Sequence, residues 1–239
     1  MRFIFCCFIL FFLSIPSYSA ELISNKSTLN SKKTAFTIQL EPYLGYQSFG
    51  SLTEKAINAS FTSSMGQYYG SFIGGRWTLE VNRLFFPGLD LTYAPSLGFS
   101  SALGKTSTTN STTAFRVGLV LGVNLYQLYK NIPLRFWIGY HPFDSINDKN
   151  NSVNTLSSGQ SETQLTGTSF KLGAGYSLTT HININIEYLR SSFSQIKSNT
   201  LSGEQSKSYS LPSTEYFGVE HVSNQTLMFS ISSPFQFAL

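Results

Sequence analysis

The chain has 239 residues and a formal net charge of +4, with 12% charged and 15% aromatic residues. This charged share is about half that of ordinary soluble domains, and no basic stripe suited to nucleic acid occurs. Both cysteines, Cys6 and Cys7, lie near the start. The rest of the chain therefore offers no disulfide, no thiolate nucleophile and no cysteine metal site.

The first segment, residues 1–20, has the organisation of a secretion signal. Arg2 precedes an apolar run over 3–13, and small residues lead up to Ala20. This run is shorter than the roughly 20 residues that a transmembrane helix needs, and no later run is comparable. We predict a cleaved signal over 1–20, a polar N-terminal arm over 21–35 and, for any membrane insertion, β-strands.

Eight later segments alternate between apolar and polar residues, which is the period of a β-strand. In chain order they are 36–47, 68–80, 89–99, 114–126, 134–143, 168–178, 182–193 and 226–239. Each is about as long as a tilted membrane-spanning strand, which places roughly 9–11 residues in hydrocarbon. In the third segment, the pattern assigns Leu97 and Phe99 to the apolar face and Ser96 to the polar face.

The connections alternate between long and short. The long ones are 48–67, 100–113, 144–167 and 194–225, and the short ones are 81–88, 127–133 and 179–181. This asymmetry is typical of an eight-stranded antiparallel up-and-down transmembrane barrel with short periplasmic turns and longer, polar outside loops. Within 194–225, residues 216–222 either extend the last strand or form a separate hairpin.

Aromatic residues recur at both ends of the apolar faces. At the predicted outer end they are Tyr46, Tyr69, Phe99, Phe115, Tyr140, Phe170, Tyr188 and Phe229. At the other end they are Phe36, Trp77, Phe136 and Phe237. Two such girdles are expected at the interfaces of a membrane barrel. The alternative is a soluble β-sandwich or lipocalin-like barrel, whose outward side chains would be polar.

With the apolar face against lipid, the polar face lines the interior. Its charged members are Glu41, Arg76, Glu80, Asp90, Arg116, Arg135, Lys171 and Glu187. An eight-stranded barrel is just wide enough for side chains to fill it, so we expect these four acids and four bases to pair, with Glu41 opposite Arg76. The favoured interpretation is a salt-bridged plug, and the alternative is a narrow conduit lined by charge.

These features resemble the small eight-stranded outer-membrane proteins typified by OmpX, OmpW and the OmpA transmembrane domain, over residues 36–239. The resemblance implies a bacterial outer-membrane location, contact with its lipids and lipopolysaccharide, and insertion by the barrel-assembly machinery. The assembly signal would be the apolar face of the terminal strand: Phe229, Ile231, Phe235, Phe237 and Leu239. That family usually ends in Phe, whereas this chain ends in Leu239. The family includes anchors, adhesins, conduits and a few lipid enzymes.

One short run carries a possible chemistry. The stretch from His221 to Asn224 is similar to the His-x-Ser-Asn stretch of outer-membrane lipid A deacylases, where His activates Ser for attack on an ester. That family's acid lies on the next strand, whereas here Glu204, Glu215 or Glu220 would have to orient His221. The alternative is an ordinary polar junction between strand and loop.

No other site emerges from the sequence. In the third long connection, Asp144, Asn147 and Asp148 lack the spacing of a calcium loop, and no cofactor or metal motif occurs. We predict a non-enzymatic barrel with a structural or surface-interaction role, whose loop ligand the pattern does not specify. The alternatives are a conduit for small solutes and a lipid A ester hydrolase using His221 and Ser223.

Overall fold

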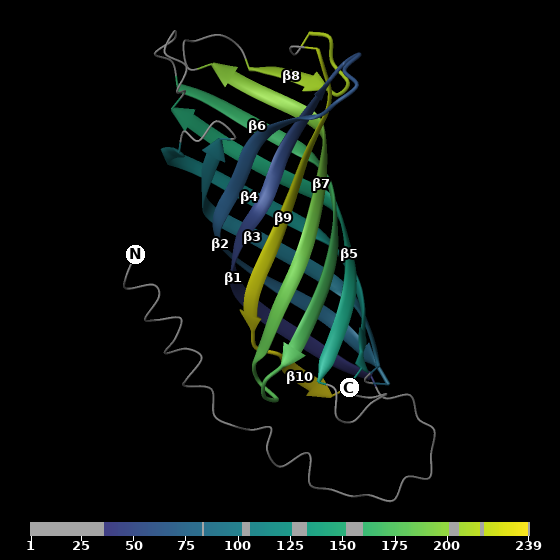
Figure 1. Ribbon diagram of the computed structural model, residues 1–239. Helices are drawn as coiled ribbons and strands as arrows, with labels where there is room; N and C mark the ends of the chain where they lie inside the picture. Colours follow the sequence, from purple (N-terminus) through teal and green to yellow (C-terminus); the bar gives the residue numbers. More distant parts are fainter. Residues whose placement is uncertain are drawn as a thin grey trace, which may run out of the picture. The chain divides into compact units, whose positions relative to one another are not determined.

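The computed structural model describes residues 36–82, 84–101, 106–125, 133–151, 160–200, 206–215 and 218–238. These residues belong to one compact unit, Thr34–Leu239 (Figure 1). The predicted secretion signal, N-terminal arm and final Leu239 lie outside the described residues. Within the described ranges, no helix is long and apolar enough to cross a membrane.

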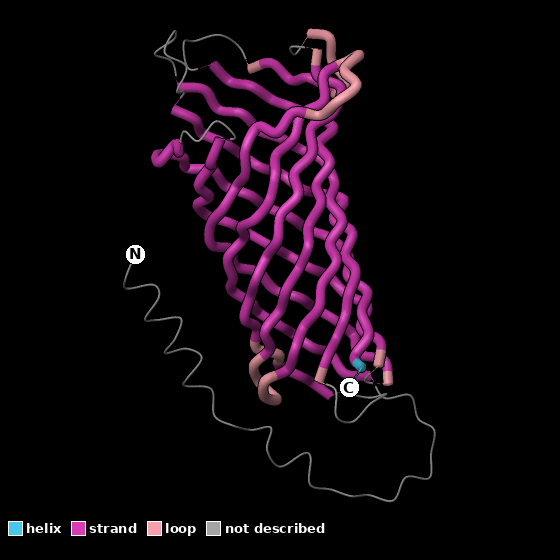
Figure 2. The backbone as a smooth tube through the Cα atoms, in the orientation of Figure 1, coloured by secondary structure: helices cyan, strands magenta, loops and turns pink. Residues whose placement is uncertain are grey.

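The unit is a closed antiparallel barrel. Its strands are β1 (Phe36–Ala56), β2 (Ser63–Val81), β3 (Phe85–Ser101), β4 (Thr106–Asn124), β5 (Leu134–Asn151), β6 (Gln160–Ser177), β7 (Asn183–Thr200), β8 (Lys207–Ser210), β9 (Val219–Ser232) and β10 (Phe235–Ala238). Strands β1 to β7 pair in sequence order, and β9 pairs with both β7 and β1. This ring confirms the predicted eight-stranded up-and-down barrel, and Figure 2 shows its strands running between turns at the two ends.

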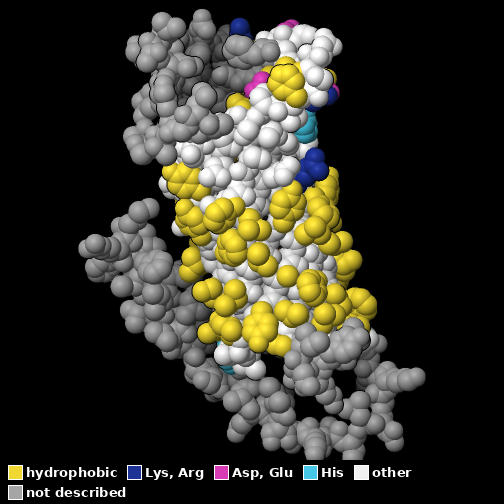
Figure 3. Space-filling model, viewed as in Figure 1, with side chains coloured by type: hydrophobic (Ala, Val, Ile, Leu, Met, Phe, Trp, Pro, Cys, Tyr) yellow, Lys and Arg dark blue, Asp and Glu magenta, His cyan; other side chains and the backbone are white. Residues whose placement is uncertain are grey.

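Exposed apolar side chains from β1 to β7, β9 and β10 form a belt on the lower part of the barrel wall, and Figure 3 shows one face of it. Side chains alternate across the wall, because successive residues of a strand point to opposite faces. In β1, for example, Leu44 is 42% exposed and Tyr46 is 47% exposed, whereas Glu41 is 3% exposed. The pattern is inverted relative to a soluble barrel, as hydrocarbon contact requires.

A β-bulge interrupts each of the strands β1, β3, β5 and β7 above the apolar belt. The bulges appear as register shifts after Gln47, Ala94 and His141 and opposite Thr166. A bulge inserts one extra residue, so every later side chain moves to the other face. Leu52, Leu97, Ile146 and Ile196 lie beyond the bulges and are buried inside the barrel.

The bulge in β3 overturns part of the predicted third segment. Pro95 and Ser96 both lie on the outside, and Leu97 is fully buried instead of facing outward. Phe99 packs against the same interior cluster and its ring lies 5.1 Å from that of Tyr68. Phe99 is therefore not part of the outer girdle. The other seven predicted girdle residues lie on the outer face or are partly exposed there.

The predicted long connections are also partly wrong, because the strands continue well beyond the apolar belt. We call this continuation, between the bulges and the β1–β2 turn at 57–62, the upper section. On the face that Figure 3 shows, its outer surface is mostly polar, and its interior holds mainly apolar side chains together with a few buried polar ones. Alternation with apolar residues outward cannot detect such strands, because in water the apolar side chains face inward. Asp144 and Asp148, assigned to a loop, belong to β5 and are buried.

The terminal strand differs from the single segment predicted over 226–239. It begins at Val219, ends as β9 at Ser232 and resumes as β10 at Phe235. The break falls at Pro234, which has no N–H to donate to a ladder. Pairing with β1 keeps the same register on both sides of the break, since Tyr43 faces Ser232 and Leu40 faces Phe235. The short β8 pairs with the upper end of β7, beyond the point where β9 leaves it.

Candidate functional site

The structure buries the eight predicted interior charges and gathers six of them into one cluster. We call this the ion-pair cluster: Glu41, Arg76, Asp90, Arg135, Lys171 and Glu187. It contains three carboxylates and three cations, so it is neutral in total. Such compensation is needed, because an unpaired charge inside a narrow barrel would lose its hydration without replacement.

Arg76 lies at the centre of the ion-pair cluster. One guanidinium nitrogen, Nη2, lies 3.2 Å from Glu187 Oε1, and the other nitrogens lie 3.9 Å from carboxylate oxygens of Glu41 and Asp90. The expected pairing of Glu41 with Arg76 is present in the register of β1 and β2. The stronger partner of Glu41, however, is Arg135 from β5, whose Nη1 donates to Glu41 Oε2 at 2.7 Å.

Lys171 completes the cluster from the other side of the barrel. Its ammonium group contacts Asp90 Oδ2 and lies 3.7 Å from Glu187 Oε2. His141 Nε2 lies 2.9 Å from the same Asp90 oxygen. Strands β1, β2, β3, β5, β6 and β7 thus meet through side chains across the interior, and the cluster ties non-adjacent strands together.

Two aromatic residues cover the cluster and were missed as site residues in the sequence. The Trp137 ring lies 4.1 Å from Arg76 Cζ, and its Nε1 donates to Glu187 Oε1 at 3.0 Å. Tyr43 donates its hydroxyl to Asp90 Oδ1 at 2.8 Å. The available signal was parity, because Tyr43 and Trp137 lie two residues from Glu41 and Arg135 on the same strand face.

The remaining interior charges lie apart from the cluster. Arg116 Nε lies 3.1 Å from Asp144 Oδ1, and both side chains are fully buried. Glu80 lies near the end of the barrel that is opposite the upper section, and it accepts a hydrogen bond from Gln236 of β10. Asp148 accepts from Thr112 and Tyr68 at 2.9 and 3.4 Å. Among the described residues no group of three His, Cys, Asp or Glu residues is arranged to hold a metal ion.

A second layer, made of apolar side chains, fills the barrel from the cluster into the upper section. Its members are Tyr43, Leu52, Tyr68, Phe72, Ala94, Leu97, Ala114, Ile146, Leu165, Leu189, Phe193, Ile196, Val219, Val222 and Met228. Phe72 and Met228 are completely inaccessible to solvent. The interior is therefore occupied by a charged layer followed by a mainly apolar layer, beside which the ion pair of Arg116 and Asp144 is also buried.

The structure does not assemble a catalytic group around His221 and Ser223. Ser223 Oγ lies 2.8 Å from Thr53 Oγ1 and hydrogen-bonds with it. Glu220 forms an ion pair with Lys55 at 2.7 Å. Within the described part of the chain, no hydrogen bond joins His221 to Ser223 or to a carboxylate. Glu204 lies outside the described residues, and Glu215 is exposed.

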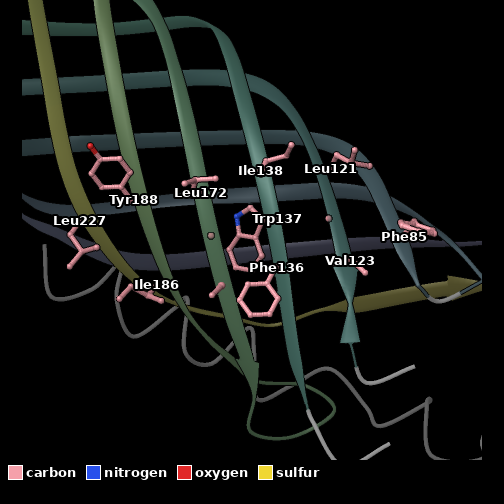
Figure 4. A pocket seen from close by; sticks show the side chains of 13 residues that line it. Phe85, Leu121, Val123, Phe136, Trp137, Ile138, Leu172, Ile186, Tyr188 and Leu227 are labelled. Atoms are coloured by element: carbon pink, nitrogen blue, oxygen red, sulfur yellow. The ribbon is translucent and has the colours of Figure 1, made fainter. Parts of the chain in front are cut away.

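A groove of about 660 Å³ lies on the barrel wall within the apolar belt (Figure 4). Residues of β3, β4, β5, β6, β7 and β9 line it, among them Leu172, Ala174, Ile186, Tyr188 and Leu227. Nearly all of the lining is apolar, as expected for a surface that hydrocarbon covers.

Comparisons with known proteins agree with this architecture. Residues 20–206 match the family described as outer membrane protein beta-barrel domain. None of the curated proteins matches the chain.

Several solved structures are similar to the chain. Neisserial surface protein A is 11% identical, covers 84% of this chain and 97% of its own, and has a TM-score of 0.40. AlkL, solved in lipid bilayers, is 11% identical, with 90% and 95% covered and a TM-score of 0.46. OprG from Pseudomonas aeruginosa is 14% identical, with 85% and 97% covered and a TM-score of 0.42.

Proposed function

Because this chain belongs to the outer membrane protein beta-barrel family, which resides in the bacterial outer membrane, we propose that it is a closed, non-enzymatic barrel that anchors a surface platform. The observation that carries the proposal is the filled interior. The ion-pair cluster and the apolar layer lie in series along the barrel axis, which is the path that a solute would take.

Opening this path would separate Arg76 from three carboxylates at once. Breaking a buried ion pair by removing one partner costs about 3–5 kcal/mol, and Arg76 has several partners. Thermal fluctuation therefore opens the cluster rarely. The apolar layer would still block water and ions, because Phe72 and Met228 have no polar atoms that could replace hydration.

The upper section supports the platform part of the proposal. Its strands are held by continuous ladders, for example between β5 and β6 up to Asn151 and Gln160. Its outward side chains are mostly polar, which suits water rather than hydrocarbon. A rigid, strand-built projection would hold the loops at a distance from the membrane, where they could meet a partner.

The arrangement at His221 and Ser223 favours a non-enzymatic role. A serine nucleophile needs a base within hydrogen-bond reach and a third group that orients the base. Here Ser223 is engaged by Thr53, and the nearest acid in sequence, Glu220, is engaged by Lys55.

The first test is electrical conductance. The purified protein, reconstituted into planar bilayers, is expected to show no discrete current steps under voltages that open a large porin measured as a reference. Regular steps from wild-type protein would contradict the closed barrel and support the conduit.

A specific observation keeps the conduit as the second candidate. The side-chain polar atoms of Gln47 and Asn224, and the Nη1 and Nη2 atoms of Arg116, are buried without a hydrogen-bond partner among the described residues. Buried polar groups of this kind commonly bind ordered water. A continuous row of such waters through the barrel would form a narrow pore.

The second test concerns orientation. An epitope inserted after Asn58, in the β1–β2 turn of the upper section, is expected to bind its antibody on intact cells. An epitope in the β6–β7 turn, after Thr180, serves as the matched control and should be detected only after permeabilisation. The reverse pattern would show that the upper section faces the periplasm and would remove the platform proposal.

A further inference from the structure

One cation of the barrel wall faces outward immediately above the apolar belt. Arg190 of β7 is exposed and forms no ion pair with any described residue. Its cross-strand neighbours are Phe170 of β6 and Gln225 of β9, and such neighbours lie about 5 Å apart. By contrast, Arg76, Arg116, Arg135 and Lys171 are all buried inside. Arg190 therefore presents its charge to whatever surrounds the barrel.

The hydrogen bonds beside Arg190 leave donors rather than acceptors. The Tyr188 hydroxyl donates to Gln225 Oε1 at 3.0 Å, which occupies the amide oxygen and leaves the two N–H donors of Gln225 Nε2. The Arg190 guanidinium adds five more donors and carries a full positive charge. A site at which these N–H donors lie beside a cation is complementary to an anion with several oxygens, such as a phosphate.

The position of this cluster along the strand matches a lipid headgroup. Tyr188 and Phe170 are exposed aromatic residues of the belt, and aromatic side chains of membrane barrels mark the interface. Arg190 lies two residues beyond Tyr188, which is about 7 Å along a strand. That step leads from hydrocarbon into the headgroup layer, where lipid phosphates lie.

An apolar groove begins directly below the donor cluster. Tyr188 pairs in register with Leu172 and with Leu227, and all three line the 660 Å³ groove on the wall (Figure 4). Ala174 and Ile186 continue it away from Arg190. A lipid whose phosphate lies at Arg190 would therefore place one of its acyl chains beside this groove.

We propose that Arg190 and Gln225 bind a phosphate of an outer-leaflet glycolipid, the lipid A part of lipopolysaccharide, while one of its acyl chains occupies the groove. The inference rests on the proposed orientation, which puts this end of β7 in the outer leaflet. The phosphate accepts hydrogen bonds from the Arg190 guanidinium and the Gln225 amide, and no covalent step is involved.

The experiment measures lipid binding to the detergent-solubilised protein by native mass spectrometry. The probes are lipid A, lipid A from which the phosphates have been removed, and phosphatidylglycerol. Wild-type protein is expected to retain one lipid A and to bind the dephosphorylated form at least about tenfold more weakly, as expected for the loss of a charge-assisted hydrogen bond. Equal affinity for all three probes would overturn the proposal, and a preference for phosphatidylglycerol would assign the site to a phospholipid instead.

Variants separate the two halves of the site. Arg190→Gln should weaken lipid A binding about tenfold, and Arg190→Lys should weaken it less, because lysine keeps the charge but lacks the planar fork. Lys207→Gln removes an exposed cation of β8, which pairs with the upper end of β7. It is the charge control and should leave lipid A binding unchanged. Unchanged binding by Arg190→Gln, with folding verified by electrophoretic mobility, would refute the phosphate contact.

The groove is tested by filling it. Ala174→Trp should reduce binding of lipid A and of its dephosphorylated form alike, because the acyl chain is displaced in both. Ile73→Trp, which places the same side chain on the outer wall at an exposed position of β2, a strand that does not line the groove, is the control. If both variants bind as wild type, the groove is not part of the site. These measurements in detergent do not depend on orientation or conductance, so their failure is distinguishable from failure of the proposed function.

Discussion

Replacing Gly173 with alanine is expected to prevent the barrel from folding. Gly173 of β6 faces Trp137 of β5 in register, and an added Cβ would lie 2.1 Å from Trp137 Cε2. The indole cannot move aside easily, because it packs on Arg76 and donates to Glu187. Overpacking typically costs about 1–3 kcal/mol and occasionally more, and a 2.1 Å approach to a fixed indole places this change at the upper end. The measurement is the fraction of protein that refolds into lipid vesicles, read as the mobility difference between folded and heated samples on gels.

Two further variants give this prediction its control. Gly75→Ala should refold as wild type, because the nearest atom to its new Cβ, the Glu41 carbonyl oxygen, lies 3.9 Å away. The double variant Gly173→Ala with Trp137→Leu should recover much of the folded fraction, because the smaller side chain leaves room. Normal refolding of Gly173→Ala alone would show that Trp137 does not occupy this position.

Replacing Arg76 with methionine is expected to destabilise the barrel by about 3–5 kcal/mol, the cost of leaving buried charge uncompensated. Methionine has a similar length but no charge, so Glu41, Asp90 and Glu187 would share only Arg135 and Lys171. The measurement is the free energy of unfolding in urea in lipid vesicles, followed by tryptophan fluorescence. Trp137 reports on the site directly, since its ring packs against the guanidinium.

A double-mutant cycle identifies the source of the loss. Adding Glu187→Gln to Arg76→Met removes the closest carboxylate partner and should restore part of the stability, because the charges are then balanced again. Lys207→Met, at an exposed position of β8, should change the free energy by no more than about 0.5 kcal/mol. Equal stabilities of wild type and Arg76→Met would mean that the ion-pair cluster does not hold the barrel together.

The alternation of residues was sufficient to predict the barrel, the strands within the apolar belt and the inward face of the eight charges assigned to the interior. Hydrocarbon makes this possible, because it imposes one sign of alternation on every strand that crosses it and penalises any charge on the wrong face. Glu41, Arg76 and Lys171 were assigned to the interior for this reason, and the structure buries all three.

The assignments of strand faces from the sequence fail above the apolar belt, where hydrocarbon no longer requires the outward face to be apolar. Above the belt both faces of a strand are compatible with water or with protein, so a single bulge decides which side chains turn inward. Leu97 and Phe99 followed the outward pattern in sequence, yet the bulge at Pro95 and Ser96 turned them into the interior. A bulge is a property of the pairing between two strands, and period-two counting within one strand does not contain it.

What the sequence by itself determined is therefore the fold, the membrane belt and the charged character of the interior. The tertiary structure alone decided which charges pair. Glu41 of β1 bonds to Arg135 of β5, and Trp137 of β5 bonds to Glu187 of β7, although none of these strands are neighbours in the ring. Such contacts depend on the diameter of the closed barrel and the stagger of its strands, which arise only when all eight strands have joined.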